Sequence, residues 1–182
     1  SIHKDLGKKV SLHLLGITRI DFIKEFASYG VTSFDSTSPF RQAFKDARNN
    51  YHFGPKRYRA IRIPQTEGNA KLMSRIKSGE VNQENAIRLE KQCLESIRSY
   101  DEGNSSVEEV LEVIREYETV HSLGTSQAMF YEEVLQDKPW KLCGCNICED
   151  IGVEVIIFRG SERNKRRGFH NLNNFYNSLQ NI

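Results

Sequence analysis

The sequence of 182 residues lacks any apolar run close to the roughly twenty residues that a membrane-spanning helix needs, and its first residues hold no apolar signal-peptide core. It also lacks internal repeats, low-complexity tracts and an obvious linker. Hydrophobic residues make up 38% of the chain, which is ordinary for a water-soluble protein. These absences argue against a membrane protein, and they make the cytoplasm the expected location.

Cysteine is scarce, and three of the four cysteines, Cys143, Cys145 and Cys148, lie within six positions. This spacing is too close for ordinary disulfides but suits thiolates that converge on one ion, with His170 as the fourth ligand. A closed Cys3His set holds a structural zinc ion and leaves no position for a substrate. The alternative is a group of reduced core cysteines beside an unrelated histidine. Cys93 is left unpaired in a helical pattern, which indicates a reducing compartment.

Charge is unevenly distributed, although the formal net charge is only +2. Residues 45–62 hold six basic side chains against one aspartate, and residues 159–167 hold five against one glutamate. Residues 80–118 hold eleven acidic and four basic side chains. A separated basic surface is typical of proteins that bind polyanions.

The first forty residues predict a βαβ unit. Residues 9–17 are a short apolar run that predicts a strand, residues 18–30 have apolar side chains at helical spacing between a capping threonine and a glycine, and residues 31–35 predict a second strand. Strands joined in this way are parallel neighbours. Asp35 then lies at the carboxyl end of a strand, where α/β folds place their chemistry.

Two groups of residues resemble the tRNA-guanine transglycosylase family. The stretch His13-Leu-Leu-Gly-Ile17, followed by the stretch from Gly30 to Arg41 with its Phe-Asp pair, looks like the last two barrel strands of that family. The later Cys-x-Cys-x2-Cys pattern, with a His-Asn pair at 170 and 171, looks like its structural zinc site. The basic segment 159–167 is most similar to DpdA-type relatives, which insert a 7-deazaguanine into DNA.

The resemblance implies an α/β fold, namely the carboxyl-terminal βαβ part of a TIM-like (β/α)8 barrel with a mostly helical insertion and a zinc-binding subdomain. We expect residues 1–44 to form the last barrel strands and helix, residues 45–136 a basic loop and helical insertion, and residues 137–182 the zinc subdomain and closing helix. The chain is then the carboxyl-terminal portion of a longer protein. Alone it is expected to be inactive, and to need the missing amino-terminal barrel portion or to self-associate.

Within the insertion, residues 51–59 predict a turn-rich loop, and residues 58–63 predict an edge strand stopped by proline. Periodic apolar residues predict a short helix around residues 72–76 and a helical hairpin from residues 82–100 and 106–123. Ser106 and Glu109 supply a capping box for the second helix of that hairpin. Its outer face is acidic, which is typical of a solvated surface.

Beyond the insertion, residues 126–135 predict a helix that is broken at Lys138-Pro139. The β-branched run 153–158 predicts a strand of the zinc subdomain, and residues 172–179 predict a closing helix that packs on the barrel.

Asp35 is the nucleophile that the resemblance implies. Exchange of a base at an anomeric carbon passes through an oxocarbenium-like transition state, and a carboxylate can trap the sugar covalently until a second base displaces it. The residue type alone also fits an Asx turn, because Asp-Ser-Thr-Ser-Pro is good turn chemistry.

Nucleic-acid contacts are expected from two basic groups. The first includes Arg41, which matches a family arginine near the exchanged base, and the second lies in the segment 159–167. The expected contact residues are Arg41, Lys45, Arg48, Arg163, Lys165, Arg166 and Arg167. Solvated surface charge is the alternative for the second group.

The expected function is replacement of guanine by a 7-deazaguanine in DNA, through a covalent intermediate between Asp35 and the sugar. The partners are then DNA and the free 7-deazaguanine base. Two alternatives stay open, which are the same pentosyl-transfer reaction on tRNA and a non-catalytic, zinc-stabilised module that binds nucleic acid.

Overall fold

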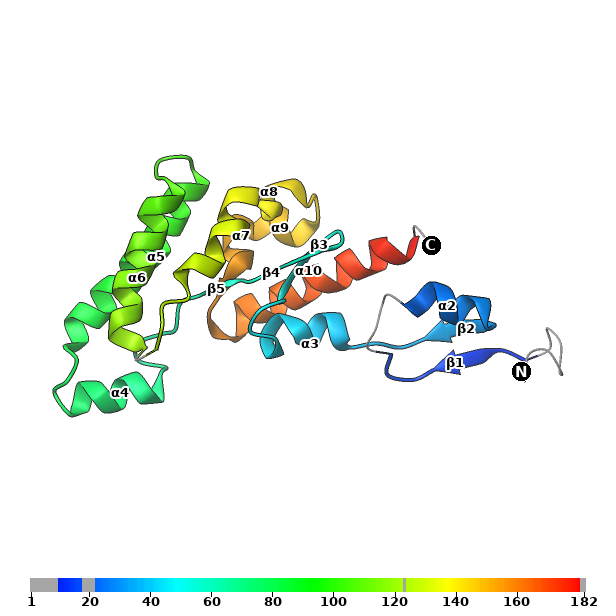
Figure 1. Cartoon of the computed structure of the whole chain (residues 1–182), viewed down its shortest axis with the longest axis horizontal. Helices are drawn as coiled ribbons and strands as arrows, with labels where there is room; N and C mark the ends of the chain where they lie inside the picture. The colour runs from blue at the N-terminus through cyan, green and yellow to red at the C-terminus, as the bar shows by residue number, and fades with distance from the viewer. Residues whose placement is uncertain (1–9, 18–21, 123, 181–182) are drawn as a thin grey trace.

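The computed structural model describes residues 10–17, 22–122 and 124–180. The molecule is elongated (Figure 1): a small unit of two strands and a helix lies at one end, and a pair of long helices lies at the other. Between them, short strands and helices surround the long helix α10 (Gly160–Gln180). The main hydrophobic core joins this middle part to the long helices.

The predicted βαβ unit is present. It consists of β1 (Leu12–Leu14), α2 (Ile23–Ser28) and β2 (Val31–Phe34), and the two strands pair in parallel. The expected cap at Thr18 lies outside the described residues. In the part of the chain that the structure describes, β1 and β2 pair only with each other.

The structure has mixed helices and strands, as predicted, but no barrel is seen within residues 10–17, 22–122 and 124–180. Strands there form three separate two-stranded sheets, β1 with β2, β3 with β4, and β5 with β6. A two-stranded parallel sheet is marginal by itself, since parallel sheets are normally covered on both faces. Membership of a larger barrel therefore stays a prediction.

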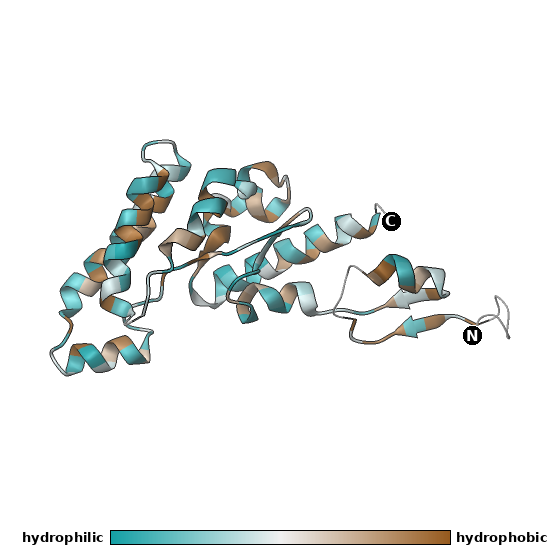
Figure 2. Ribbon diagram, in the orientation of Figure 1, coloured by the Kyte–Doolittle hydropathy of each residue, from teal (hydrophilic) through white to brown (hydrophobic). Residues whose placement is uncertain are grey.

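The helical insertion follows the sequence prediction closely. It contains α4 (Ala70–Lys77), α5 (Gln83–Asp101) and α6 (Val107–His121), and the last two form a hairpin. Ser106 and Glu109 make both hydrogen bonds of the predicted capping box. Figure 2 shows hydrophobic and hydrophilic residues alternating along these helices.

Two carboxylates of the acidic insertion are buried rather than solvated. Glu90 forms an ion pair of 2.5 Å with Arg159, and Glu118 accepts hydrogen bonds from Ser126 and from the backbone of Gln127. Both residues lie on the buried face of the hairpin, so they are not part of the predicted acidic outer face. Their partners lie outside the helical hairpin, so the sequence pattern of the hairpin did not reveal them.

The predicted loop at residues 51–59 is instead a β-hairpin. Strands β3 (Tyr51–Phe53) and β4 (Lys56–Tyr58) pair antiparallel around Gly54, whose φ is +54°. Glycine suits this turn position, because the backbone there is left-handed.

The predicted edge strand is reduced to β5 (Ile61–Arg62), because Ala60 donates its N–H to the side chain of Asn50 rather than to a strand.

The predicted strand at residues 153–158 is wrong over most of its length. A 3-10 helix, η4 (Gly152–Ile156), comes first, and only β6 (Ile157–Phe158) is extended, pairing in parallel with β5. An extended strand would place Val155 and Ile156 on opposite faces, whereas the 3-10 turn buries both. Burial thus overrides the strand preference of this β-branched run.

The helix predicted at residues 126–135 is split into η3 (Ala128–Tyr131) and α7 (Glu132–Asp137). The predicted break is confirmed: Lys138 is left-handed, with φ of 44°, and α8 (Pro139–Leu142) begins immediately after it.

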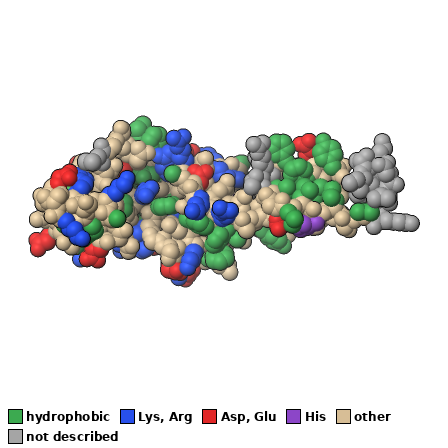
Figure 3. Space-filling view, turned by 90° about the horizontal axis from the view of Figure 1, so that it is seen from below, with side chains coloured by type: hydrophobic (Ala, Val, Ile, Leu, Met, Phe, Trp, Pro, Cys, Tyr) green, Lys and Arg blue, Asp and Glu red, His purple; other side chains and the backbone are tan. Residues whose placement is uncertain are grey.

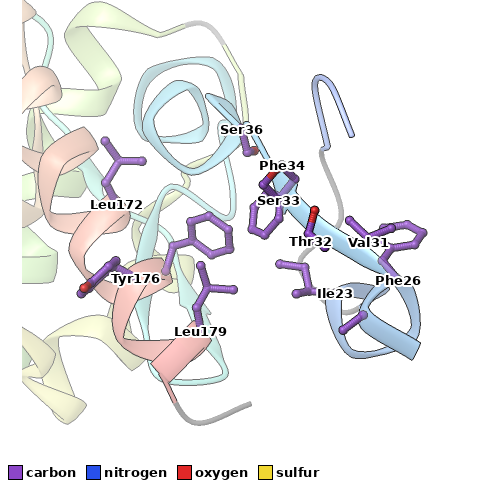
Figure 4. A pocket seen from close by; sticks show the side chains of 12 residues that line it. Ile23, Phe26, Val31, Thr32, Ser33, Phe34, Ser36, Leu172, Tyr176 and Leu179 are labelled. Atoms are coloured by element: carbon purple, nitrogen blue, oxygen red, sulfur yellow. The ribbon is translucent and has the colours of Figure 1, made fainter. Parts of the chain in front are cut away.

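The closing helix is longer than predicted, since α10 begins at Gly160 and so includes the basic segment. It packs along α3 (Ser38–Lys45). Its last turns face the βαβ unit across an apolar hollow of about 630 Å³, in which the rings of Phe34 and Phe175 are 6.0 Å apart. Figure 4 shows Leu172, Tyr176 and Leu179 on the α10 side of this hollow and Ile23 and Phe34 on the other.

Candidate metal centre and strand-end carboxylate

The four predicted metal ligands converge. The sulfur atoms of Cys143, Cys145 and Cys148 lie 3.6, 3.4 and 3.3 Å from Nδ1 of His170. All four ligand atoms lie within 4.8 Å of one another. A tetrahedral ion with Zn–S bonds of about 2.3 Å and Zn–N bonds of about 2.0 Å holds sulfur and nitrogen about 3.5 Å apart. The donor set and its spacing therefore fit a four-coordinate metal ion such as zinc.

The local chain geometry explains the convergence. Cys143 follows the last turn of α8, and Gly144, with φ of 60°, turns the chain so that Cys145 becomes the N-cap of α9 (Asn146–Ile151). The thiol of Cys145 accepts the backbone N–H of Cys148 at 3.4 Å. The three cysteines thus lie at the junction of α8 and α9, and α10 supplies His170.

The hairpin β3–β4 orients His170. Its Nε2 lies 2.7 Å from the carbonyl oxygen of His52, so this nitrogen carries the proton and Nδ1 faces the sulfur atoms. The ring of Tyr51 stacks on the imidazole at 4.2 Å and 9°. A histidine ligand normally donates its second N–H in this way, which fixes its tautomer.

Tyr51 also contacts the sulfur atoms. Its hydroxyl lies 3.4 Å from Sγ of Cys148, and burial raises the pKa of this hydroxyl well above its usual value. A protonated hydroxyl donates to a thiolate, which stabilises the charged sulfur. Hydrogen bonds from Cys148 and His170 lower the pKa of the Cys143 thiol against the effect of burial. The pKa of the Cys145 thiol is also lowered, by its hydrogen bond with His170 against the effect of burial, whereas the hydrogen bond to Cys143 and burial raise the pKa of Cys148. The thiolate, which is the form that binds a metal, is thus favoured at Cys143 and Cys145.

The side chain of Asn171 binds the β3–β4 hairpin and not the ring of His170. Its side chain accepts the N–H of His52 at 3.0 Å and donates to the carbonyl oxygens of Pro39 and Asn50. The carbonyl oxygen of His52, and not the neighbouring Asn171, accepts the proton of His170 Nε2. The roles of Tyr51 and His52 were missed, because no local pattern links a hairpin at residues 51–58 to the cysteines.

Asp35 lies directly after β2, at the carboxyl end of both parallel strands, and its side chain is exposed. One carboxylate oxygen accepts the backbone N–H of Gly16, which follows β1. Backbone hydrogen bonds join Asp35 to Leu14 and Ile17 at 3.1 and 3.0 Å. The carboxylate of this exposed residue is therefore held by the neighbouring strand end.

The first predicted contact group is accessible. Arg41 and Lys45 lie on α3 and Arg48 follows it, and all three are exposed. They line one shallow hollow of about 530 Å³. Because α3 begins three residues after Asp35, this group lies close in the chain to the strand-end carboxylate.

The second predicted contact group is paired or buried. Arg163 lies 2.5 Å from Glu154, Lys165 lies 3.0 Å from Glu162, and Arg166 lies 3.0 Å from Asp150.

Arg167 is completely buried. Its guanidinium donates to the carbonyl oxygens of Ala43, Val155 and Ile157 and to the side chain of Asn164. This burial contradicts a contact between Arg167 and a nucleic acid. The residue instead ties α10 to α3.

The fold and the site define a mixed helix-and-strand protein with a Cys3His cluster that can hold a metal ion. No family model matches the chain. The chain is similar to the DNA-guanine transglycosylase of Salmonella montevideo, with 48% identity over 180 residues, which cover 96% of this chain and 43% of the relative. The chain thus spans less than half the length of this relative. The similarity supports the transglycosylase relationship that the sequence predicted.

Within the described residues, no helix is both long enough and apolar enough to cross a membrane.

Proposed function

We propose that this chain is part of a transglycosylase that replaces guanine with a 7-deazaguanine in DNA. The observation that carries the proposal is the 48% identity, over nearly the whole chain, to a protein named DNA-guanine transglycosylase. The accessible strand-end carboxylate and the Cys3His cluster supply the catalytic group and the structural centre that such an enzyme needs.

In the proposed reaction, a carboxylate oxygen of Asp35 attacks the anomeric carbon while the bond to the guanine nitrogen breaks. The electron pair of that bond leaves with guanine, which takes up a proton. The nitrogen of the incoming base then attacks the same carbon, loses its proton and releases Asp35. Two displacements retain the configuration at the sugar, as in retaining glycosidases. The N–H of Gly16 orients the carboxylate before the attack.

A stacked guanine is closed to this attack, so the target nucleotide has to leave the helix stack. We assign Arg41, Lys45 and Arg48 to phosphate contacts beside it, since they are exposed and follow Asp35 in the chain. Zinc in the Cys3His cluster has a structural role, because four protein ligands leave no open coordination position.

The proposed enzyme needs more than these residues. The parallel strands β1 and β2 leave Leu12 and Leu15 38% and 78% exposed, and Phe22 and Tyr29 of the same unit are 37% and 62% exposed. Apolar side chains at the edges of a small sheet fit further strands, which the longer relative has room to supply. We retain the division into residues 1–44, 45–136 and 137–182 as a proposal.

The association test uses the 182 residues alone. Light scattering is expected to show concentration-dependent self-association, or a shift to a single complex when the amino-terminal part of the gene product is added. A monodisperse monomer at all concentrations, with no binding of the amino-terminal part, contradicts this need for further strands.

The function test uses the whole gene product. It is incubated with labelled guanine or a labelled 7-deazaguanine and with DNA and tRNA in parallel, and each polymer is then digested to nucleosides. Label in DNA nucleosides alone is the expected result. Label in tRNA alone overturns the DNA assignment, and label in neither polymer leaves a metal-stabilised binding module as the function.

A further inference from the structure

Three neighbouring hollows that share lining residues follow one another from α3 to α4, and we call them together the basic groove. The first, between α3 and Arg48, shares residues 45–48 with a second hollow of about 830 Å³. The second shares Arg62, Gln127, Tyr131 and Phe158 with a third hollow of about 870 Å³, which reaches α4. The groove thus runs from the start of α3, beside Asp35 in the chain, into the helical insertion.

Basic side chains without an acidic partner line this groove. Among the described residues, no carboxylate forms an ion pair with any of the following: Arg41, Lys45, Arg48, Arg59, Arg62 and Lys71.

The two acidic residues of the lining are already engaged. Asp46 accepts the backbone N–H groups of Arg48 and Asn49, and Glu118 binds Ser126 and Gln127. Among the described lining residues, the six cations without an ion-pair partner thus outnumber these two carboxylates, and the groove is positively charged.

An exposed aromatic ring lies in the middle of the groove. Phe130 is 48% exposed, and the guanidinium of Arg59 lies over its ring at 4.3 Å, held by a hydrogen bond of 2.9 Å to Gln127. A cation and an aromatic face side by side are what single-stranded nucleic-acid sites use, the cation for phosphate and the ring for base stacking.

The start of α10 is a poorer phosphate site, although its sequence is as basic. Arg163, Lys165 and Arg166 each have a carboxylate partner within 3.0 Å. A phosphate would have to compete with that carboxylate, and fewer counterions would be released on binding. Figure 3 shows Lys and Arg side chains over the part of the molecule away from the βαβ unit, whose surface on this face is largely hydrophobic.

We propose that the basic groove holds the DNA strand that leads away from the exchanged guanine. Phosphates of this strand contact Arg41, Arg48 and Arg62, and one base stacks on Phe130. The placement of the guanine at Asp35 rests on the proposed function, whereas the binding of DNA along the groove does not. The helical insertion then has a direct role, because α4 and η3 form the far wall of the groove.

The test compares two triple variants of the whole gene product that remove the same charge. The groove variant is Arg48→Gln/Arg59→Gln/Arg62→Gln, and the comparison variant is Arg163→Gln/Lys165→Gln/Arg166→Gln. Binding to fluorescein-labelled single-stranded and duplex DNA is measured by anisotropy over a range of salt concentrations. Circular dichroism and metal content establish that each variant is folded. If the groove triple does not fold, the double variant Arg48→Gln/Arg62→Gln replaces it, since both residues are exposed.

The groove variant is expected to bind at least about tenfold more weakly at moderate salt, and the salt slope should fall by about 0.7–0.9 for each phosphate that the variant no longer neutralises. The comparison variant should bind less than about threefold more weakly. Phe130→Ala should weaken single-stranded binding by about fivefold or more without changing the salt slope. An equal or larger weakening in the comparison variant overturns the proposal, as does groove binding of RNA in preference to DNA.

Base exchange measured on the same samples separates this proposal from the proposed function. If the groove variant binds DNA with unchanged affinity while base exchange in DNA is observed, the proposed DNA binding along the groove is wrong and the proposed function stands. If DNA binding depends on the groove but no exchange is observed, the proposed function is wrong and the groove proposal stands.

Discussion

Gly168 of α10 lies directly against Phe40 of α3. A methyl group at position 168 would approach Cδ2 and Cε2 of the Phe40 ring to 2.6 and 2.8 Å and the Phe40 carbonyl oxygen to 3.1 Å. The ring has little room to move, because it packs edge-on against Phe44 and Phe169 at 5.6 and 5.2 Å. The contact brings α10, and with it His170, close to α3.

Gly168→Ala is therefore expected to destabilise the fold. Alanine gains about 1 kcal/mol of helix propensity over glycine, but overpacking a close helix contact costs about 1–3 kcal/mol. The midpoint of thermal unfolding should fall by about 2–4 °C for each net kcal/mol of destabilisation. Asn173→Ala is the matched control, since it improves helix propensity at an exposed position of the same helix. A variant at 168 as stable as the control would contradict the close contact.

Cys145→Ser is expected to remove the metal. The thiol of Cys145 is a predicted metal ligand, and a serine keeps the N-cap of α9 but supplies no thiolate, so the change should lower zinc content below one ion per chain and destabilise the region around α8–α10. The metal content of purified protein and its thermal unfolding measure this. Treatment of the unchanged protein with a chelator should have the same effect on unfolding.

Cys93→Ser is the control for the metal prediction. Cys93 is buried in α5, and its thiol lies 3.5 Å from the carbonyl oxygen of Val113, away from the cluster. Burial raises the pKa of Cys93 to about 12, so the thiol stays protonated and unsuited to a metal. Full metal content in Cys145→Ser, or its loss in Cys93→Ser, would refute the ligand set.

Asp35→Asn is expected to abolish base exchange in the whole gene product, by at least about a thousandfold, because an amide cannot form the covalent bond to the sugar. An asparagine side chain still accepts the N–H of Gly16, so folding and metal content should not change. Asp150→Asn, at an exposed aspartate of α9, should retain exchange. Retained exchange in the variant at 35 would remove this residue from the nucleophile's role.

Arg167→Lys is expected to destabilise the protein by about 2–4 kcal/mol. An ammonium cannot reach the four oxygen atoms that the planar guanidinium of Arg167 binds, and the change leaves buried carbonyl groups unpaired. Burial lowers the pKa of Arg167 only to about 9, so the residue is charged at neutral pH. Denaturant unfolding measures the decrease in the free energy of unfolding.

Arg163→Lys is the control for position 167. It changes a partly exposed ion pair with Glu154 and should cost less than about 1 kcal/mol. If the variant at 167 keeps its stability but loses DNA affinity and salt dependence, the structural role assigned to Arg167 is wrong.

Sequence reasoning succeeded where neighbouring residues decide the structure. The capping box of Ser106 and Glu109 involves groups three positions apart, and the three cysteines lie within six positions at the junction of α8 and α9. The βαβ unit was also predicted from neighbouring residues, because its local apolar pattern indicates a strand, a helix and a strand in that order.

Sequence reasoning failed where segments far apart in the chain decide the local structure. Val155 and Ile156 prefer a strand locally, yet the surrounding core buries both and fixes a 3-10 turn. Arg167 looks like a surface cation in its basic run, but its partners include Ala43, 124 positions away. The role of Tyr51 was missed for the same reason, since its ring stacks on His170, which lies far from it in the sequence.

These long separations bear on how the chain folds as it is synthesised. Asn171 binds the carbonyl oxygen of Pro39 across 132 positions, and His170 binds that of His52 across 118. These two contacts of the segment 38–53 can therefore form only after α10 has left the ribosome. Such late, non-local contacts slow folding, and a hairpin and helix that wait with apolar surface exposed favour aggregation during that interval. A premature stop between positions 149 and 159 would leave the three cysteines without His170 and without α10.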